Sequence, residues 1–379
     1  MASVLETLAS LVRINSVNPE WGGPGEAEAA SFVRKFFADS GLDVIEEEVL
    51  PGRSNLMVRI PGRNRERSVL LEAHLDTVSA EDMTIPPFVP EIRDGFLFGR
   101  GACDVKGGLA AMMHAVREIA GAGERPPCDV FIAAVIDEEH HYRGVTALIE
   151  WLRKSGRPMP EAAVVAEPTG LRAVRANKGV LRFRISTKGK SAHSSKPHLG
   201  RNAIVAMAPV IAALDQEAER LAKGPAHPLL GPATLSIGVI QGGAQVNFVP
   251  EHCCVALDRR LLPGECGEEV LDQIEALVAP LGAELERPAT LVDEAMETPA
   301  DARVVKTASQ VLADLGENAE SIGVPFGCDC TKLSRAGIPS LIFGPGSIDQ
   351  AHGSVEFVET RQVEKAVEFY RDFLRSFGS

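Results

Sequence analysis

The chain has 379 residues and a formal net charge of −13, with 39 basic against 52 acidic side chains. Nucleic acids and anionic membranes are bound through basic surfaces, so this charge argues against both as partners. A length above roughly 250–300 residues predicts two domains, and a hydrophobic content of 45% suffices to fill their cores.

Seven cysteines are present, an odd number without any Cys-x-x-Cys spacing. This pattern favours reduced thiols in a cytoplasmic protein over a disulfide framework. Cys328 and Cys330 lie one residue apart, but without a second cysteine pair they make a weak case for a metal-thiolate site. The longest clean apolar run, residues 130–136, has the length of a buried strand and not the ~20 residues of a membrane span. We therefore expect a cytoplasmic protein that does not bind membranes.

The first part of the chain alternates predicted helices and strands. Leu5, Leu8, Leu11 and Val12 recur at helical spacing and predict an opening amphipathic helix. Further helices are predicted at residues 27–40, 107–120 and 145–154. Strands are predicted at residues 55–60, 69–73 and 130–136. The last two strands are continuous apolar runs, as expected of strands covered on both faces, so we expect an α/β layer.

The pattern changes near residue 176. A strictly alternating strand at 181–185 is followed by predicted elements in the order helix, strand, strand, helix, strand, at residues 202–222, 234–240, 253–261, 268–278 and 283–286. This order suits a ferredoxin-like α+β domain. The α/β pattern then returns at residues 302–314 and 340–343. We therefore predict a discontinuous α/β catalytic domain of residues 1–175 and 288–379, and an inserted α+β lid or dimerisation domain of residues 176–287.

Imidazole and carboxylate side chains follow several of these strands. His74 and Asp76 are two residues apart in extended chain and point the same way, at the strand end where open α/β sheets gather their ligands. We expect the Asp76 carboxylate to hold the second nitrogen of the His74 ring. Asp104 lies in a glycine-bounded loop, residues 99–108, which lacks the Gly-Lys-Ser/Thr ending of a phosphate-binding loop.

Two adjacent carboxylates, Glu138 and Glu139, follow the strand at 130–136. Such a pair is either a solvated acidic turn or a pair relieved by a cation or a shared proton. In the second case one carboxylate binds metal and the other takes a proton from water. With Glu167 and His352, these residues supply the nitrogen and oxygen ligands of two zinc-like ions, which suit amide hydrolysis.

The motifs together resemble those of the zinc aminoacylase/carboxypeptidase family, which includes acetylornithine deacetylase, succinyl-diaminopimelate desuccinylase and bacterial glutamate carboxypeptidase. The resemblance covers essentially the whole chain, in the same order, through residues 73–78, 99–108, 137–139, 167–169 and 351–352. It implies Glu138 as general base and five ligands for two zinc ions, with cobalt as an alternative metal. The implied ligands are His74 and Glu167 on one ion, Glu139 and His352 on the other, and Asp104 between them.

The inserted domain carries a segment, residues 189–197, similar to the one whose histidine stabilises the oxyanion in this family. That histidine reaches the partner subunit's site in dimeric members, so the resemblance assigns the role to His193 and allows a homodimer through the inserted domain. Asn247 and Arg260 match positions that face substrate in relatives, although Arg260 could instead form a surface salt bridge. The glycine turn at Gly344 is expected to offer backbone amides to a substrate carboxylate.

The expected activity is removal of the acyl group from an N-acyl amino acid, as in acetylornithine deacetylase or succinyl-diaminopimelate desuccinylase. One alternative is a metallopeptidase of the glutamate-carboxypeptidase or dipeptidase type, acting on a small peptide. An alternative of another class is a non-catalytic binding protein on the same fold. The complete set of implied ligands, with Glu138 and His193, weighs against that last alternative.

Overall fold

The computed structural model describes residues 2–378, and the chain divides into two compact units. The first contains the chain up to Arg175, residues Thr298–Ile322 and the chain from Cys328 onward. The second contains Ala176–Glu297 and Gly323–Gly327. It extends ten residues beyond the predicted end at 287, because β15 (Leu291–Asp293) pairs with β9 (Gly179–Lys188) inside this unit. None of the helices described is long and apolar enough to cross a membrane.

The first unit is built on a sheet with the strand order β1-β2-β6-β3-β7-β18-β8. The strands are β1 (Asp43–Leu50), β2 (Arg53–Ile60), β3 (Asn64–His74), β6 (Cys128–Val135), β7 (Ala162–Val165), β18 (Ser340–Ile342) and β8 (Val174–Asn177). Strands β6, β3, β7 and β18 are parallel neighbours, and β1 and β2 form an antiparallel edge. All eight residues of β6 are buried, as the apolar run that begins at residue 130 predicts for most of them. Two short strands, β16 (Met296–Glu297) and β17 (Ile322–Val324), pair with β8.

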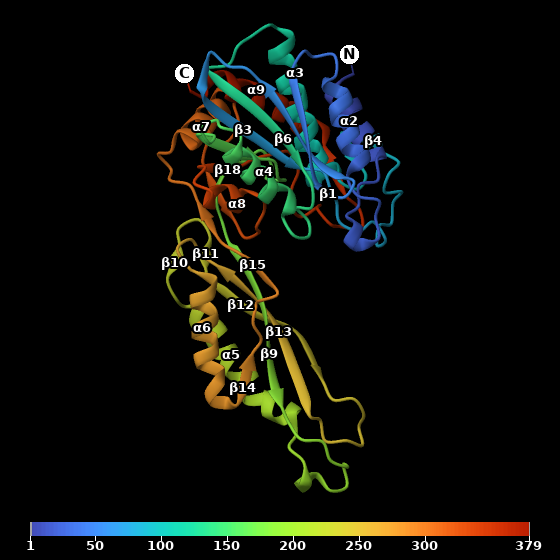
Figure 1. The fold of residues 1–379 in the computed structure, drawn as a ribbon, viewed down its shortest axis with the longest axis vertical. Helices are drawn as coiled ribbons and strands as arrows, with labels where there is room; N and C mark the ends of the chain where they lie inside the picture. Colours follow the sequence, from blue (N-terminus) through green and yellow to red (C-terminus); the bar gives the residue numbers. More distant parts are fainter. Residues whose placement is uncertain (1, 379) are drawn as a thin grey trace. The chain divides into compact units, whose positions relative to one another are not determined.

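Helices cover both faces of this sheet (Figure 1). One face packs against α1 (Val4–Arg13), α2 (Ala27–Phe37), α3 (Gly107–Gly121), α7 (Arg303–Asp314) and α9 (Thr360–Ser376), which share one hydrophobic core with alternate residues of β2, β3 and β6. The other face carries α4 (Arg143–Lys154) and α8 (Cys330–Arg335). This layering confirms the predicted α/β fold. A small separate sheet has the order β19-β5-β4, from Phe357–Glu359, Phe96–Phe98 and Glu91–Arg93.

The second unit has the element order β-α-β-β-α-β. It contains β9, α5 (Ala203–Ala222), β12 (Thr234–Gly242), β13 (His252–Leu261), α6 (Gly267–Val278) and β14 (Ala283–Leu285). The sheet is antiparallel with the order β12-β13-β9-β14, the arrangement of a ferredoxin-like fold. Helices α5 and α6 share one apolar core with β9 and β13. A two-residue ladder of β10 (Ala226–His227) and β11 (Gly231–Pro232) and four short helical turns, η1 (Pro19–Trp21), η2 (Ala102–Lys106), η3 (Pro197–Leu199) and η4 (Ala279–Leu281), complete the elements.

Candidate metal and catalytic site

The five implied metal ligands all lie in the first unit, next to the ends of its elements. His74 is the last residue of β3, while Glu139 and Glu167 follow β6 and β7. Because these three strands are parallel neighbours, their carboxyl ends meet at one edge of the sheet. Asp104 lies in η2, before α3, and His352 lies in the segment before β19.

Asp104 lies between the two histidines and contacts each with a different oxygen. Its Oδ1 is 3.0 Å from His74 Nε2, and its Oδ2 is 3.3 Å from His352 Nε2. Glu139 Oε1 is 3.1 Å from the same His352 nitrogen. One ligand atom each of His74, Asp104 and Glu139 fall within 4.8 Å of one another. This is the arrangement that a carboxylate shared by two ions requires.

The charges of the cluster show that it suits cations. Hydrogen bonds to Asp104 and Glu139 raise the pKa of His352 to about 11. Burial lowers the pKa of His74, but the hydrogen bond to Asp104 and the nearby charge of Glu138 outweigh burial and hold it well above its ordinary value. Burial opposes ionisation of Asp104, yet its hydrogen bonds to His352 and His74 hold its pKa well below the usual range. The donor set therefore fits divalent metal ions.

Glu138 and Glu167 are buried carboxylates at this cluster. Their exposed fractions are 8% and 4%, and no hydrogen bond to either carboxylate is found among residues 2–378. Burial raises the pKa of both groups well above the ordinary value. A buried carboxylate without a partner is unfavourable unless it is protonated or faces a cation. Glu167 can thus serve as a metal ligand and Glu138 as a proton acceptor.

Asp76 holds His74 through its backbone carbonyl and not, as predicted, through its carboxylate. His74 Nδ1 donates to the backbone carbonyl of Asp76 at 3.0 Å, whereas the Asp76 carboxylate is 3.7 Å from that nitrogen. The carboxylate instead accepts the backbone N–H groups of Glu138 and Glu139, at 3.1 and 3.2 Å, and the Asn18 side-chain amide at 2.8 Å. Asp76 therefore fixes the turn that presents the two glutamates, and its carbonyl leaves His74 Nε2 free to face a metal.

A buried network behind this turn was not predicted. Arg53 donates to both oxygens of Glu26, at 2.7 and 2.6 Å, and also contacts Asp137 Oδ1 at 3.1 Å. Glu26 accepts the Asp137 N–H at 3.1 Å. These bonds hold Asp137 at a φ of +65°, an uncommon conformation for a residue other than glycine. Glu26 and Arg53 are distant in sequence from the acidic motif at residues 137–139, so no local sequence pattern indicated that they support it.

A second group missed from sequence is the carboxyl pair Glu72 and Asp329. Their exposed fractions are 0% and 1%, and their four oxygens accept from no N–H or hydroxyl donor of the described residues, so the two carboxyl groups can bond only to each other through a proton. Burial raises the pKa of Glu72 to about 8 and that of Asp329 well above its ordinary value. A glutamate inside the apolar run of β3 was the available signal. Cys328 and Cys330, on either side of Asp329, are buried free thiols.

Gly344 differs from its predicted role as an amide donor to substrate. Its N–H donates to Thr169 Oγ1 at 3.1 Å, and its carbonyl accepts from the Leu171 N–H at 3.0 Å. A Cβ at this position would lie 2.6 Å from the Glu167 carbonyl oxygen. Glycine is therefore required because the chain passes close to the backbone of Glu167.

The predicted substrate-contacting residues of the second unit fall at two places in that unit. His193 and Asn247 lie together, because the Ser194 N–H donates to the Asn247 carbonyl at 3.0 Å and His193 forms a bridge with Phe248. This place is next to the start of β13, at His252. Arg260 lies near the carboxyl end of the same strand, where it pairs with Asp258 at 2.8 Å. Between His252 and Arg260 the strand spans roughly 26 Å, at ~3.3 Å per residue. One chain therefore does not bring His193 and Arg260 together.

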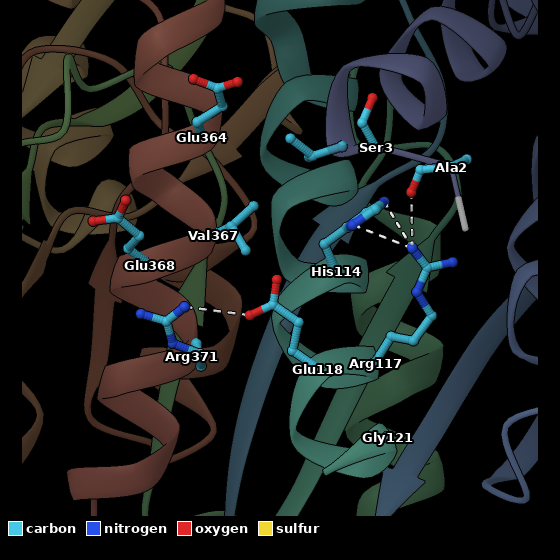
Figure 2. A pocket seen from close by; sticks show the side chains of 11 residues that line it. Ala2, Ser3, His114, Arg117, Glu118, Gly121, Glu364, Val367, Glu368 and Arg371 are labelled. Carbon is cyan, nitrogen blue, oxygen red and sulfur yellow. Dashed lines mark hydrogen bonds and ion pairs between the residues drawn. The ribbon is translucent and has the colours of Figure 1, made fainter.

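A groove of about 610 Å³ opens between α3, α9 and the start of α1, and none of the implied ligands lines it (Figure 2). Two arginines of its wall are bonded to protein: Arg371 contacts Glu118 at 3.3 Å, and Arg117 donates to the Ala2 carbonyl at 3.2 Å. His114 is buried there, with Nε2 2.8 Å from Thr7 Oγ1. We interpret His114 as a structural residue of the core.

We expect His114 to destabilise the fold in acid. Burial and the charge of Arg117 lower its pKa to about 4, so the unfolded chain takes up the proton first, near pH 6.5. The free energy of unfolding of the wild type should therefore fall as the pH drops from about 6.5 to 4. Over this range the wild type should lose up to ~3 kcal/mol more than His114→Gln, which has no group to titrate at this position. Urea unfolding of both proteins across this range measures the difference, with the exposed His198→Gln as control. A difference independent of pH would contradict the assignment.

The model of peptidase family M20/M25/M40 matches residues 70–376. Among curated proteins, acetylornithine deacetylase of Vibrio campbellii is 30% identical over 372 residues, covering 96% of this chain and 95% of the relative. Acetylornithine deacetylase of Proteus mirabilis is 32% identical over 321 residues, covering 82% and 79%.

Solved structures share the fold over the whole chain. A tripeptidase from Staphylococcus aureus superposes with a TM-score of 0.81 at 22% identity, covering 99% of this chain and 98% of that one. An M20 family metallo-carboxypeptidase from Sulfolobus solfataricus gives a TM-score of 0.81 at 19% identity, with complete coverage of both chains. The chain therefore belongs to peptidase family M20/M25/M40 and is a metal-dependent hydrolase of amide bonds, as its sequence predicts.

Proposed function

We propose that the chain is a two-metal deacylase that removes the acyl group from an N-acyl amino acid, of the acetylornithine deacetylase or succinyl-diaminopimelate desuccinylase type. The observation that carries this proposal is Asp104, which gives one oxygen to each of two histidines. Similarity to proteins named acetylornithine deacetylase, at 30–32% identity, supports the substrate class. The free cysteines suit a cytoplasmic enzyme.

The proposed ligands are His74 and Glu167 on one ion, Glu139 and His352 on the other, and Asp104 on both. Zinc is the proposed metal, with cobalt as an alternative, because the donors are imidazole nitrogen and carboxylate oxygen. When bound, the two ions lower the pKa of a water and polarise the scissile carbonyl.

Glu138 is the proposed general base. Its buried carboxylate has no protein partner among residues 2–378, so it is free to accept a proton from the attacking water. A raised pKa lets the same group hold that proton and return it to the nitrogen of the departing amine. The backbone of Glu138 stays fixed by its bond to Asp76 during the transfer.

His193 is the proposed donor to the oxyanion. Its Nδ1 accepts the Ser195 N–H at 3.2 Å and lies 2.8 Å from Ser195 Oγ. A neutral ring with an accepting Nδ1 carries its proton on Nε2. That exposed N–H can donate to the oxygen that becomes negative in the transition state.

We further propose that the protein acts as a homodimer through its second unit. His193 and Arg260 lie near opposite ends of β13, too far apart for one small substrate to contact both in one chain. Two chains could supply one residue each. The second unit also exposes β12 at a sheet edge, and an unpaired strand edge is a template for pairing. Large apolar side chains are exposed on α5, β12 and the following turn: Ile204, Val205, Val239, Ile240, Val246 and Phe248.

A hydrolysis screen tests the substrate class. Protein loaded with zinc or cobalt should cleave N-acetylornithine or N-succinyl-diaminopimelate faster than dipeptides, with amine release as the readout. Arg260 of one chain and Asn247 of the other chain of the proposed dimer are proposed to grip the free carboxylate, since arginine binds carboxylates through paired hydrogen bonds. Methyl esters of the best substrate should therefore lose most of the activity. Equal cleavage of ester and free acid would contradict this pocket.

The same screen decides between a deacylase and a peptidase. The family is named for peptidases, so a small peptide is the second candidate substrate. Preferential release of a C-terminal amino acid from dipeptides would favour that alternative. No hydrolysis of any substrate by protein that holds two metal ions would instead favour a non-catalytic binding protein.

A further inference from the structure

Glu356 connects the two chain segments that carry Asp104 and His352. It is fully buried, lies four residues after His352 and directly precedes β19. Strand β19 pairs with β5 so that Phe357 lies opposite Phe98. This pairing brings Glu356 to the loop after β5, where its carbonyl accepts the Gly99 N–H at 3.0 Å.

The carboxylate of Glu356 bonds to three donors of that loop. Its Oε1 accepts the backbone N–H groups of Cys103 and Asp104, at 2.9 and 3.1 Å. Its Oε2 accepts from Arg100 Nη1 at 2.8 Å. Arg100 in turn reaches the carbonyl of Gly353, next to His352, at 3.5 Å. Both segments are therefore tied to one buried carboxylate.

Asp104 depends on such an anchor because its backbone is irregular. Gly101 before η2 has a φ of +80°, and Asp104 itself has non-helical φ and ψ of −120° and 94°. Regular helical bonding therefore does not fix its orientation. A shared ligand must present each of its two oxygens to a different ion, so a small rotation would weaken both sites.

We propose that Glu356 is a positioning residue that holds Asp104 and His352 in the geometry needed to bind two metal ions; this inference rests on the proposed two-metal function. Glu356 is not one of the proposed metal ligands, and its carboxylate bonds to Arg100, Cys103 and Asp104. Its carboxylate accepts the backbone N–H groups that no helical bond satisfies in the segment of Asp104. Through Arg100, it also holds the segment of His352. In Glu356→Gln an amide NH₂ would face either Arg100 or the two backbone N–H groups, and donor would meet donor.

The test is a calorimetric titration of metal-stripped protein with zinc. We expect Glu356→Gln to bind zinc about 10–100-fold more weakly than the wild type, the usual effect of losing an outer partner of a metal ligand. The absorption spectrum of bound cobalt should change as well, because the ligand geometry changes. Glu356→Asp keeps the charge and should lose less affinity. If Glu356→Gln does not fold, the zinc affinity of Glu356→Asp is compared with that of the wild type instead.

Asp129→Asn is the matched control. Asp129 is also a buried carboxylate, at 1% exposure, that accepts from an arginine, Arg59, and from a backbone N–H, that of Gly62, each at 2.8 Å. It lies at the start of β6, away from the strand end that carries Glu138. Both variants should lower thermal stability, but only Glu356→Gln should weaken zinc binding.

Two outcomes would overturn the inference. Zinc affinity and cobalt spectrum unchanged in both Glu356 variants would overturn the positioning role alone, since wild-type binding would still support two metals. Wild-type protein that binds no zinc or cobalt would overturn both this role and the proposed two-metal function.

Discussion

Replacing Glu138 by glutamine should lower turnover by about 10²–10⁴ or more while the protein still binds two metal ions. Glutamine has nearly the same shape as glutamate but cannot accept the proton of the attacking water. The Glu138 side chain forms no hydrogen bond within residues 2–378, and its anchoring bond to Asp76 comes from the backbone. The variant should therefore keep the fold and the turn that presents Glu139.

Turnover on the best substrate and metal content per chain should be measured on the same sample. Glu161→Gln is a suitable control, because Glu161 pairs with Arg67 before the start of β7, away from the strand end that leads to Glu167. It should keep near wild-type turnover. If Glu138→Gln did the same, Glu138 would have no part in the chemistry. If it lost its metal ions, Glu138 would be a ligand and not the base.

The α/β layer could be predicted because its central strands are buried on both faces. Residues 69–73 of β3 and 130–135 of β6 are buried, and both stretches are mostly apolar in the sequence. Strand β1 was missed because it is an edge strand whose acidic residues, 46–48, break the apolar pattern. The end of the second unit was also missed, since β15 belongs there only through its pairing with the distant β9.

The candidate site was predictable where its residues follow the strands as motifs. His74, Asp104, Glu139 and His352 are brought together as expected, because parallel strands deliver their ends to one edge. The supporting residues were not predictable in the same way. Glu26, Arg53 and Glu356 act through contacts between segments far apart in sequence, and such contacts leave no local pattern.

The failed prediction for Gly344 has a related cause. A glycine turn beside a site can supply backbone amides to a ligand or allow two chain segments to pass closely. Only the distances in the structure distinguish these cases. The Gly344 N–H already donates to Thr169, and a side chain at this position would clash with Glu167, so Gly344 allows two chain segments to pass closely. Asp76 shows the same limit, because the sequence indicated the right residue but not which of its oxygens faces His74.

His193→Ala should lower turnover by about 10²–10³, the usual loss for one donor to an oxyanion. The exposed ring of His193 bonds mainly to its near neighbour Ser195, so its removal should leave stability almost unchanged. Unchanged turnover would refute the role. The large expected loss also makes a sharper experiment feasible, which asks whether His193 acts on its own chain or on a second one.

His193→Ala and Glu138→Gln should restore each other when the two inactive proteins are mixed and allowed to exchange chains. If His193 acts on the partner, a mixed dimer has one site with both Glu138 and a donated His193, and a second site with neither. Random exchange makes half of the dimers mixed, so about 25% of wild-type activity should return. If His193 acts within its own chain, every site in the mixture lacks one of the two residues, and no activity returns. That result, with dimers confirmed by sedimentation, would place Arg260 outside the site that His193 serves, because one chain separates the two residues along β13.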